Sequence, residues 1–531
     1  MSKLQQSECK NSFDCEDLQY YDYTNRKTKP SPLFTKLMPL EFQTDLPLHS
    51  SDINNSGNYE DSDSMKKRVS FHTLGCRLNQ SETESLMRNF KQNGYAVVPE
   101  TEQADVCVVN TCTVTEHSDA KNRQLIRRLQ RQNPEAIIAV TGCYAQMDPS
   151  AVAGIEGVRL VIGNQEKMKI TEYLSNLNIN NSPLIVRHKI SRKPFATPAF
   201  SQNKTSQNNF SENRRDFKTQ ELNSENPEQE LLRQVELKNT RAMLKIQDGC
   251  DFMCTFCIIP FARGRSRIRE FSNLQDEARL LISEGVREIV ITGVNIGTYK
   301  TEKENIIGVI DFLNTLPGLS RIRISSIEPT TVPEVLFEYM SDPQHKLVPF
   351  FHLPLQSGSD SVLQKMRRRY TSGEYADEVW KAYDAVPDLC IGTDVMVGFP
   401  EESQAEFECT KNLLEKLPVA YFHVFPFSAR KGTPAFSIED QVLPSVKQKR
   451  GEELRKLSIQ KRYDFHNQFM GKIRNVLWES PDSKGNISGY TDNYIRVILN
   501  EKSCYDLQNQ ILPTRLLAHQ GHNVTGVNMV N

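Results

Sequence analysis

One stretch decides how the chain is organised: Met243-Leu-Lys-Ile-Gln-Asp-Gly-Cys250-Asp-Phe-Met-Cys254-Thr-Phe-Cys257-Ile-Ile-Pro260. An apolar, strand-like run ends at Gly249, and three cysteines follow at the spacing C-x3-C-x2-C. Three thiolates can hold three irons of a [4Fe–4S] cluster, which leaves the fourth iron open to chelate a small molecule. The alternatives are a structural zinc knot or three unrelated buried cysteines. A zinc knot closes with a fourth Cys or His, and none follows within the next thirty residues, so the sequence favours the cluster.

The composition sets the broad class of the protein. With 65 Lys+Arg against 66 Asp+Glu, the 531-residue chain has a net charge of −1, so affinity for nucleic acid must come from local basic patches. Twelve cysteines without a secretory signal indicate a reducing compartment, in which thiols are available as ligands. Because no apolar run approaches the length of a membrane span, we expect a cytoplasmic protein with no membrane partner.

Changes in pattern along the chain predict five segments. They are a disordered extension (1–65), an open α/β domain (66–175), a polar insertion or linker (176–240), a larger α/β domain (241–466) and a small β-domain (467–531). The insertion is richest in Asn, Ser, Gln and Glu over Gln202–Glu230, where too few apolar residues are present to contribute to a core.

In the first α/β domain, three predicted strands end in a cysteine, namely Cys76, Cys112 and Cys143. Ligands of open α/β sheets bind outside the carboxyl ends of the strands, so we expect the three thiols to meet there and to hold a second cluster. Buried cysteines are also common in strands without any function, and we expect Cys107, in mid-strand, to be one of these.

The larger α/β domain alternates strands and helices six times. The strand candidates are Ala242–Gln247, Glu288–Thr292, Ile322–Ser326, Val348–Leu355, Leu389–Val397 and Val419–Phe425. This repetition predicts a parallel sheet that curls into a partial (β/α)6 barrel, with its functional residues at the carboxyl ends of the strands. The cysteine triplet follows the first of these strands.

The last segment reads as a series of short strands. The candidates are Arg474–Glu479, Ile487–Tyr490, Tyr494–Leu499 and Ile511–Ala518, the last confined by Pro513 to a sheet edge or a strand start. A small β-barrel of this kind either presents a face to RNA or serves as a stabilising cap.

Three basic runs lie beside the predicted cluster loops: Arg123 to Arg131 on one helix, Arg263 to Arg269, and Arg367 to Arg369. A run of basic residues is usually just a solvent-exposed surface of the protein. Here all three runs are placed where a polyanion would have to pass, so we interpret them as contacts for nucleic-acid phosphates.

The chain resembles the methylthiotransferase family of radical S-adenosylmethionine (SAM) enzymes from residue 68 to about 531, apart from the 176–240 insertion. The resemblance lies in the order of the two cysteine triplets and a C-terminal domain similar to TRAM. Four segments look most like the branch that acts on N6-threonylcarbamoyladenosine in tRNA: Gly75-Cys-Arg-Leu-Asn-Gln-Ser-Glu-Thr-Glu84, Asn110-Thr-Cys112, Thr141-Gly-Cys143 and Cys257-Ile-Ile-Pro-Phe-Ala-Arg-Gly264.

The resemblance implies two [4Fe–4S] clusters, SAM as a cofactor and tRNA as the substrate. Cys250, Cys254 and Cys257 would hold the SAM cluster in a radical SAM barrel, whereas the N-terminal triplet would hold an auxiliary cluster that carries the sulfur. SAM cleavage would give a radical that removes hydrogen from C2 of the modified adenine, a position closed to ordinary acid–base catalysis. A reductant such as flavodoxin or ferredoxin is implied, and the sequence indicates no particular sulfur donor.

Strand ends of the barrel also supply candidate SAM contacts. The six residues are Gly293, Asn295, Glu328, Gln356, Val395 and Phe399. We expect Gly293 to let the backbone approach the methionyl end of SAM and Glu328 and Gln356 to bind its ribose hydroxyls. The segment from Val395 to Phe399 is expected to pack on the adenine.

Three other functions are considered. Two are sibling reactions, methylthiolation of isopentenyladenosine in tRNA and of an aspartate in a ribosomal protein. The third is a non-catalytic iron–sulfur protein that binds RNA. Release of 5′-deoxyadenosine from SAM under reducing conditions separates the enzymes from the last of these.

Overall fold

The computed structural model describes residues 66–178, 182–197, 240–482, 485–499 and 506–529. The predicted extension up to residue 65 and the Gln202–Glu230 part of the insertion lie outside the described residues. Met65–Asn531 forms one compact unit. Among the described helices, none is long and apolar enough to cross a membrane.

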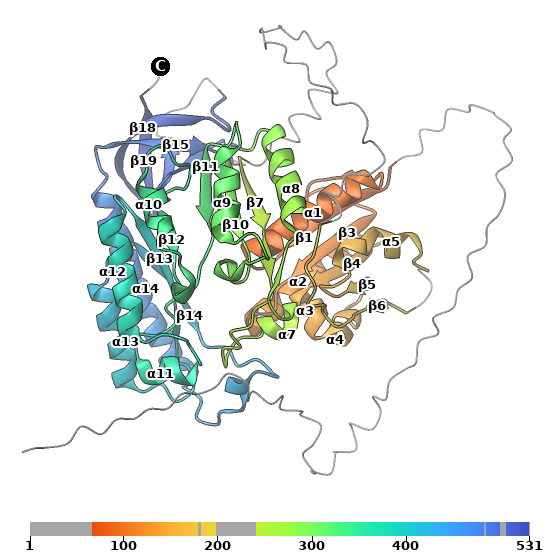
Figure 1. Ribbon diagram of the computed structural model, residues 1–531. Coiled ribbons are helices and arrows are strands. Elements are labelled where there is room, and N and C mark those ends of the chain that lie inside the picture. The colour runs from red at the N-terminus through yellow and green to blue at the C-terminus, as the bar shows by residue number, and fades with distance from the viewer. Residues whose placement is uncertain (1–65, 179–181, 198–239, 483–484, 500–505, 530–531) are drawn as a thin grey trace, which may run out of the picture. The chain divides into compact units, whose positions relative to one another are not determined.

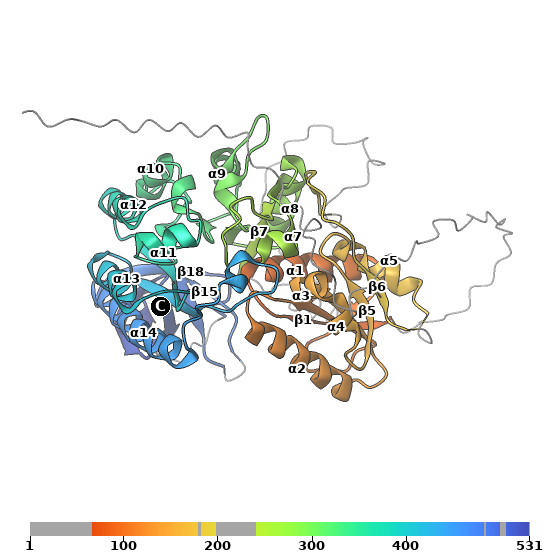
Figure 2. The ribbon, with the colours of Figure 1, turned by 90° about the horizontal axis from the view of Figure 1, so that it is seen from below.

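The N-terminal sheet has six parallel strands in the order β2-β1-β3-β4-β5-β6. Their bounds are β1 (Arg68–Thr73), β2 (Ala96–Val97), β3 (Val106–Thr111), β4 (Ile137–Gly142), β5 (Val158–Ile162) and β6 (Leu184–Val186). The helices α1 (Arg77–Gln92) and α2 (Glu116–Gln132) cover opposite faces of this sheet (Figure 2), because alternate strand residues point to opposite sides. The open α/β domain is thereby confirmed.

The insertion begins later than the sequence indicated. The sequence pattern places Leu184–Val186 in the polar insertion, but in the structure this segment pairs in parallel with Leu160–Ile162 and forms the edge of the N-terminal sheet as β6. Its last residue, Val186, is buried in the core of that sheet. A strand of three residues is too short to show an alternating pattern of its own, so it could not be recognised among the surrounding polar residues.

The partial (β/α)6 barrel is confirmed. Its parallel strands are β7 (Arg241–Lys245), β10 (Glu288–Thr292), β11 (Arg321–Ile324), β12 (Phe350–His352), β13 (Cys390–Val397) and β14 (Tyr421–Pro426). A parallel bridge between Ile322 and Leu347 joins its two halves.

Helices flank the barrel strands on the outside (Figures 1 and 2). They are α8 (Phe271–Ser283), α9 (Ile306–Thr315), α10 (Val335–Ser341), α11 (Asp360–Lys365), α12 (Ser372–Ala385), α13 (Gln404–Lys416) and α14 (Pro444–Asn467). The main apolar core of the protein lies between these helices and the strands.

The C-terminal domain is a closed barrel in the order β15-β16-β17-β19-β18. The strands are β15 (Ile473–Trp478), β16 (Ser488–Thr491), β17 (Arg496–Leu499), β18 (Ile511–Gln520) and β19 (Asn523–Asn528). Pro513 is the third residue of β18 and pairs with Asn475 of β15, whereas pairing with β19 begins at Thr514. The Pro513 carbonyl accepts from the Met529 N–H at 2.9 Å, one residue beyond the end of β19, so the proline lies where regular pairing with β19 stops.

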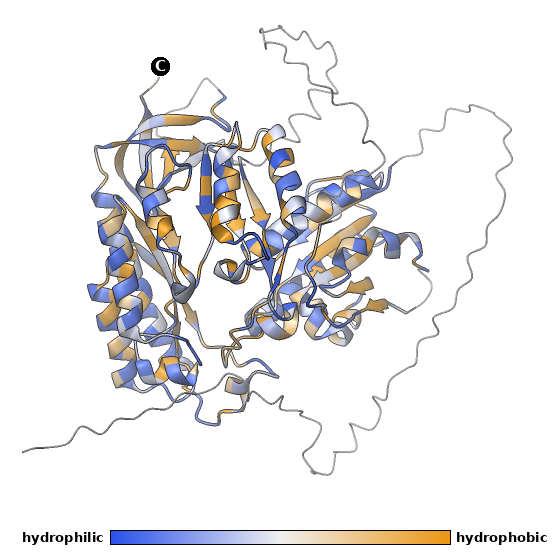
Figure 3. Ribbon diagram, in the orientation of Figure 1, coloured by the Kyte–Doolittle hydropathy of each residue, from blue (hydrophilic) through white to orange (hydrophobic). Residues whose placement is uncertain are grey.

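Charged residues of β11 hold this small barrel against the large one. Figure 3 shows hydrophilic residues on β11. Arg323 is fully buried and donates to Glu288 Oε1 at 2.7 Å and to the Asp492 carbonyl at 2.9 Å. Arg321 donates to the carbonyls of Asn475, at 2.7 Å, and Tyr490, at 2.9 Å. Guanidinium groups therefore satisfy strand carbonyls of the C-terminal barrel at the junction.

Candidate functional site

The strand ends of the N-terminal sheet bring the first cysteine triplet together. Cys76 precedes α1, Cys112 directly follows β3, and Cys143 begins the short helix α3 (Cys143–Met147). Burial, together with the neighbouring thiols of Cys143 and Cys76, raises the pKa of Cys112 to about 11. Such thiols stay protonated at neutral pH unless a bound metal displaces the proton.

Gly75 makes the close approach of these cysteines possible. Its φ is +112°, and a Cβ at this position would stand 2.7 Å from the Cβ of Cys112 and 3.1 Å from its sulfur. Any larger residue would push the first strand end away from the second. Cys107, by contrast, is buried within β3, where Ser70 Oγ donates to its sulfur at 3.5 Å.

The second triplet lies between β8 (Gln247–Asp248) and α7 (Ile259–Arg263). Burial raises the pKa of Cys250 to about 11 and that of Cys257 to about 12, and the neighbouring thiols of the triplet contribute to both shifts. Within this loop Met253 has a φ of +52°, a strained conformation for a residue with a side chain. Arg368 Nη1 donates to the Cys254 sulfur at 3.4 Å.

Neither triplet has the geometry of a site for a single metal ion. Within the described part of the chain, one group of three ligands converges tightly enough for one ion, and it is His352, Asp394 and His423. The cysteines of each triplet are neighbours but do not converge in this way. Three cysteines without a fourth ligand from the described residues fit an iron–sulfur cluster with one open iron better than a tetrahedral zinc.

The two triplets lie on adjoining elements. Helix α3, which Cys143 begins, packs against α7, which starts two residues after Cys257 (Figure 1). Asn164 Nδ2 strengthens this junction by donating to the Ala262 carbonyl at 2.6 Å. The fold therefore places the loop of one cysteine triplet directly beside that of the other.

A buried charge cluster lies at the same junction. Glu82 of α1 accepts from Lys167 at 2.6 Å, Lys245 at 2.7 Å and Arg263 at 2.8 Å. Asp248 accepts from Lys245 at 2.7 Å and Arg263 at 3.1 Å. Burial alone would raise the pKa of Glu82, but the three cations hold it well below its usual range. The cluster thus fastens α1 to the loop that carries the second triplet.

The first two SAM candidates lie at the carboxyl end of β10. Gln247 Oε1 accepts from the backbone N–H groups of Val294 and Asn295, both at 2.9 Å. A Cβ at Gly293 would stand 3.0 Å from the Gln247 carbonyl, so glycine is needed for this contact. Asn295 is 2% exposed, and neither polar atom of its side chain has a partner within the described residues. A buried amide of this kind fits a polar ligand.

Glu328 and Gln356 lie at the ends of the next strands. Arg368, which contacts Cys254, also donates to Glu328, so the guanidinium connects this carboxylate to the second triplet. Gln356 is half-buried with a φ of +71°, and its backbone pairs with β13. Both residues lie at the carboxyl ends of the barrel strands, where SAM is expected to bind.

The side chains of Val395 and Phe399 do not face an open pocket. Both are 0% exposed: Val395 belongs to the core under the helices, and Phe399 packs with Met366 and Phe427. The expected adenine contact by these side chains is therefore not supported by the structure. Strand residues alternate, so Asp394 and Met396 occupy the opposite face of β13. Applied to the sequence, the same alternation would have predicted that Val395 and Asp394 face opposite sides of the strand.

In the basic run after the second triplet, three of the four arginines are buried and therefore not available to phosphates, whereas Arg265 is half-buried. Arg263, Arg267 and Arg269 are 1%, 8% and 1% exposed, and each forms a buried ion pair with an acidic residue. On α2, by contrast, Arg127, Arg128 and Arg131 are exposed. In the third run Arg367 and Arg369 are exposed, whereas Arg368 is engaged with Glu328.

Comparison with known proteins decides the family. Residues 68–163 match the model of the Uncharacterized protein family UPF0004, and residues 244–414 match the Radical SAM superfamily. Over 461 residues the chain is 36% identical to the threonylcarbamoyladenosine tRNA methylthiotransferase MtaB of Bacillus subtilis, a match covering 85% of this chain and 93% of that protein. This chain belongs to the radical SAM methylthiotransferase family.

Two further relatives represent different reactions of such methylthiotransferases. The MtaB protein of Aquifex aeolicus is 35% identical over 77% of this chain and 92% of its own. The tRNA-2-methylthio-N(6)-dimethylallyladenosine synthase of Clostridium botulinum is 32% identical over 79% of this chain and 88% of its own. Membership of the radical SAM superfamily means that this methylthiotransferase uses SAM and a [4Fe–4S] cluster.

The buried charge cluster of the methylthiotransferase gives a prediction about stability. Replacing Glu82 with Gln leaves three buried cations without their main counter-charge, so the free energy of unfolding should fall by about 3–5 kcal/mol. Urea denaturation of the anaerobically prepared protein measures the change. Glu102→Gln is the matched control, because its ion pair with Arg68 is exposed (41% and 49%) and should contribute less than about 1 kcal/mol. Equal effects of the two substitutions would show that the buried cluster does not stabilise the junction.

Proposed function

We propose that this methylthiotransferase converts N6-threonylcarbamoyladenosine, next to the anticodon of tRNA, into its 2-methylthio derivative. The observation that carries the proposal is the juxtaposition of two cysteine triplets through α3 and α7, in a chain that matches two MtaB proteins over most of their length. One triplet serves radical formation and the other serves sulfur supply, and the reaction needs both next to the same base.

The residues of the second triplet hold the SAM cluster in this proposal. When bound, the cluster supplies the electron that cleaves SAM, giving the 5′-deoxyadenosyl radical that removes hydrogen from C2 of the adenine. Arg368 donates to the sulfur of Cys254 and to Glu328, and it thereby fixes the ligand loop beside the strand end that carries Glu328. The unpartnered amide of Asn295 supplies hydrogen bonds for SAM.

Cys76, Cys112 and Cys143 hold the auxiliary cluster. Arg263 and Lys167 lie close enough to Cys143 for their charges to offset part of the pKa increase that burial causes in this thiol. Such cations favour thiolate ligands, as a cluster requires. A flavodoxin or ferredoxin is the proposed reductant.

Exposed arginines on α2, which begins four residues after Cys112, support binding of the tRNA backbone. We assign the C-terminal barrel, similar to TRAM, to RNA binding as well. A tRNA substrate is available in the cytoplasm, and we place the protein there.

The deciding experiment offers the reconstituted enzyme two tRNAs, one with N6-threonylcarbamoyladenosine and one with isopentenyladenosine. Mass spectrometry of the digested nucleosides should show a methylthio group on the threonylcarbamoyl species. The relatives from Clostridium botulinum make the dimethylallyl reaction the main alternative. Product on the isopentenyl species alone would overturn the substrate assignment, although it would leave the methylthiotransferase chemistry intact.

A further inference from the structure

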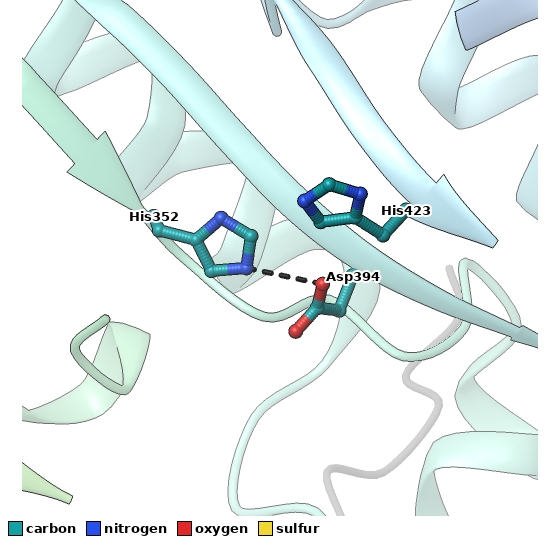
Figure 4. Close-up of side chains that lie close together, drawn as sticks. All are labelled: His352, Asp394 and His423. Carbon is teal, nitrogen blue, oxygen red and sulfur yellow. Dashed lines mark ion pairs between the residues drawn. The ribbon is translucent and has the colours of Figure 1, made fainter. Parts of the chain in front are cut away.

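The inner wall of the large barrel carries one polar row that the reaction as described so far does not use. His352, Asp394 and His423 come from the adjacent strands β12, β13 and β14 (Figure 4). His352 Nε2 lies 3.1 Å from Asp394 Oδ1, and the ligand atoms of all three residues lie within 4.8 Å of one another. We call this group the inner triad.

Strand alternation places the inner triad inside the barrel. The neighbouring residues Phe351, Val395 and Phe422 belong to the core under the outer helices. Residues of opposite parity must point the other way. On the same faces of these strands, Tyr421, two residues before His423, and Cys390, four residues before Asp394, pack against the C-terminal barrel.

The opposite end of this wall reaches the second cysteine triplet. Met396, two residues beyond Asp394 on the same face of β13, packs in a cluster with Phe256, which lies between Cys254 and Cys257. Two strand residues span about 7 Å. The inner triad therefore lies between the loop of the second cysteine triplet and the C-terminal barrel.

A glycine on the middle strand leaves room for the rings of His352 and Tyr421. His352 pairs in register with Gly392, and Gly392 pairs with Tyr421. A Cβ at Gly392 would stand 2.5 Å from the Tyr421 ring and 3.0 Å from His352 Nδ1. Any other residue would displace the two rings, so glycine keeps His352 directed at Asp394.

The inner triad is accessible and has unused hydrogen-bonding capacity. His423 is exposed, and its ring has no hydrogen-bond partner within the described residues. The side chain of Asp394 is 26% exposed, and only its Oδ1 is engaged by His352. Phe425, two residues after His423 on the same strand, is 46% exposed and offers an aromatic surface for stacking.

The first cysteine triplet also borders this space. Arg77 follows Cys76 directly, donates to Tyr494 Oη at 2.6 Å, and lies close enough to His423 for its charge to act on the ring. A positive charge at this position is suited to a ligand that carries a carboxylate.

We propose that the inner triad binds the N6 substituent of the target adenosine, a urea-linked amino acid with a carboxylate. This inference rests on the proposed function and names the residues that select the substrate. Asp394 accepts from the N–H groups of the urea, His352 is held in place by Asp394, and His423 donates to the carbonyl or carboxylate. An isopentenyl group offers none of these partners and would leave the polar row buried and unpaired.

The test measures how tightly the reconstituted full-length enzyme binds anticodon stem-loops with threonylcarbamoyladenosine, isopentenyladenosine or plain adenosine. Wild type should prefer the threonylcarbamoyl RNA over plain RNA by at least about tenfold, and His423→Ala or Asp394→Asn should reduce that ratio by about tenfold. Asp384→Asn, exposed on α12, is the matched control and should keep the wild-type ratio. The iron content of each variant shows that it folds and carries its clusters.

Three results would overturn the inference. If the variants keep the wild-type ratio while wild type forms methylthio product, the inner triad does not read the substituent, although the proposed function stands. If wild type forms no product from threonylcarbamoyl RNA, the function and the inference both fail. If wild type binds one equivalent of zinc or manganese that both variants lose, with the RNA preference unchanged, the triad is a metal site instead.

Discussion

Replacing Cys250, Cys254 and Cys257 together with Ala is expected to halve the iron content, from about eight to about four per chain, and to abolish SAM cleavage. The three thiols belong to a single loop between β8 and α7, so their loss removes one cluster without touching the strand ends of the N-terminal sheet. Iron analysis and chromatography of 5′-deoxyadenosine measure the two effects after anaerobic reconstitution.

A matched control for this variant is Cys409→Ala. Cys409 is an exposed residue on α13, so the substitution should keep about eight irons and full SAM cleavage. Complete loss of iron from the triple variant would show that the two sites do not assemble independently. Retention of all the iron would refute the assignment of the second triplet as ligands.

The corresponding change in the first triplet should leave SAM cleavage intact and abolish the methylthio product. With Cys76, Cys112 and Cys143 replaced by Ala, SAM cleavage to 5′-deoxyadenosine should persist, whereas methylthio product should disappear. Radical formation depends on the loop after β8, and sulfur supply depends on three strand ends of a different sheet. Mass spectrometry of tRNA nucleosides and measurement of 5′-deoxyadenosine in the same reaction separate the two activities.

Cys107→Ala provides the control for the first triplet. This cysteine is 0% exposed near the start of β3, five residues before Cys112, and it is not expected to be a ligand. Its replacement should preserve methylthio product. If the triple variant also forms product, the N-terminal cysteines have only a structural role.

Much of the fold could be predicted because its signals are local. The predicted barrel strands are mostly short apolar runs, and all six overlap β7, β10, β11, β12, β13 and β14, although β11 alternates arginine with isoleucine. Each candidate cysteine follows such a run, so the strand-end rule was enough to bring Cys76, Cys112 and Cys143 together. The edge strand β6 was not predicted because its three residues are too few to show an alternating pattern.

The sequence by itself thus determined the two triplets, the parallel barrel and the family. Only the tertiary structure decided which charges are buried, since Arg263 meets Glu82 across 181 residues of sequence and no local pattern contains both partners. It also decided that Val395 faces the helices while Asp394 faces the barrel, and that His352 and His423 join Asp394 there. Such groups depend on the register between parallel strands, which is set by packing over the whole sheet and leaves no signal in any single strand.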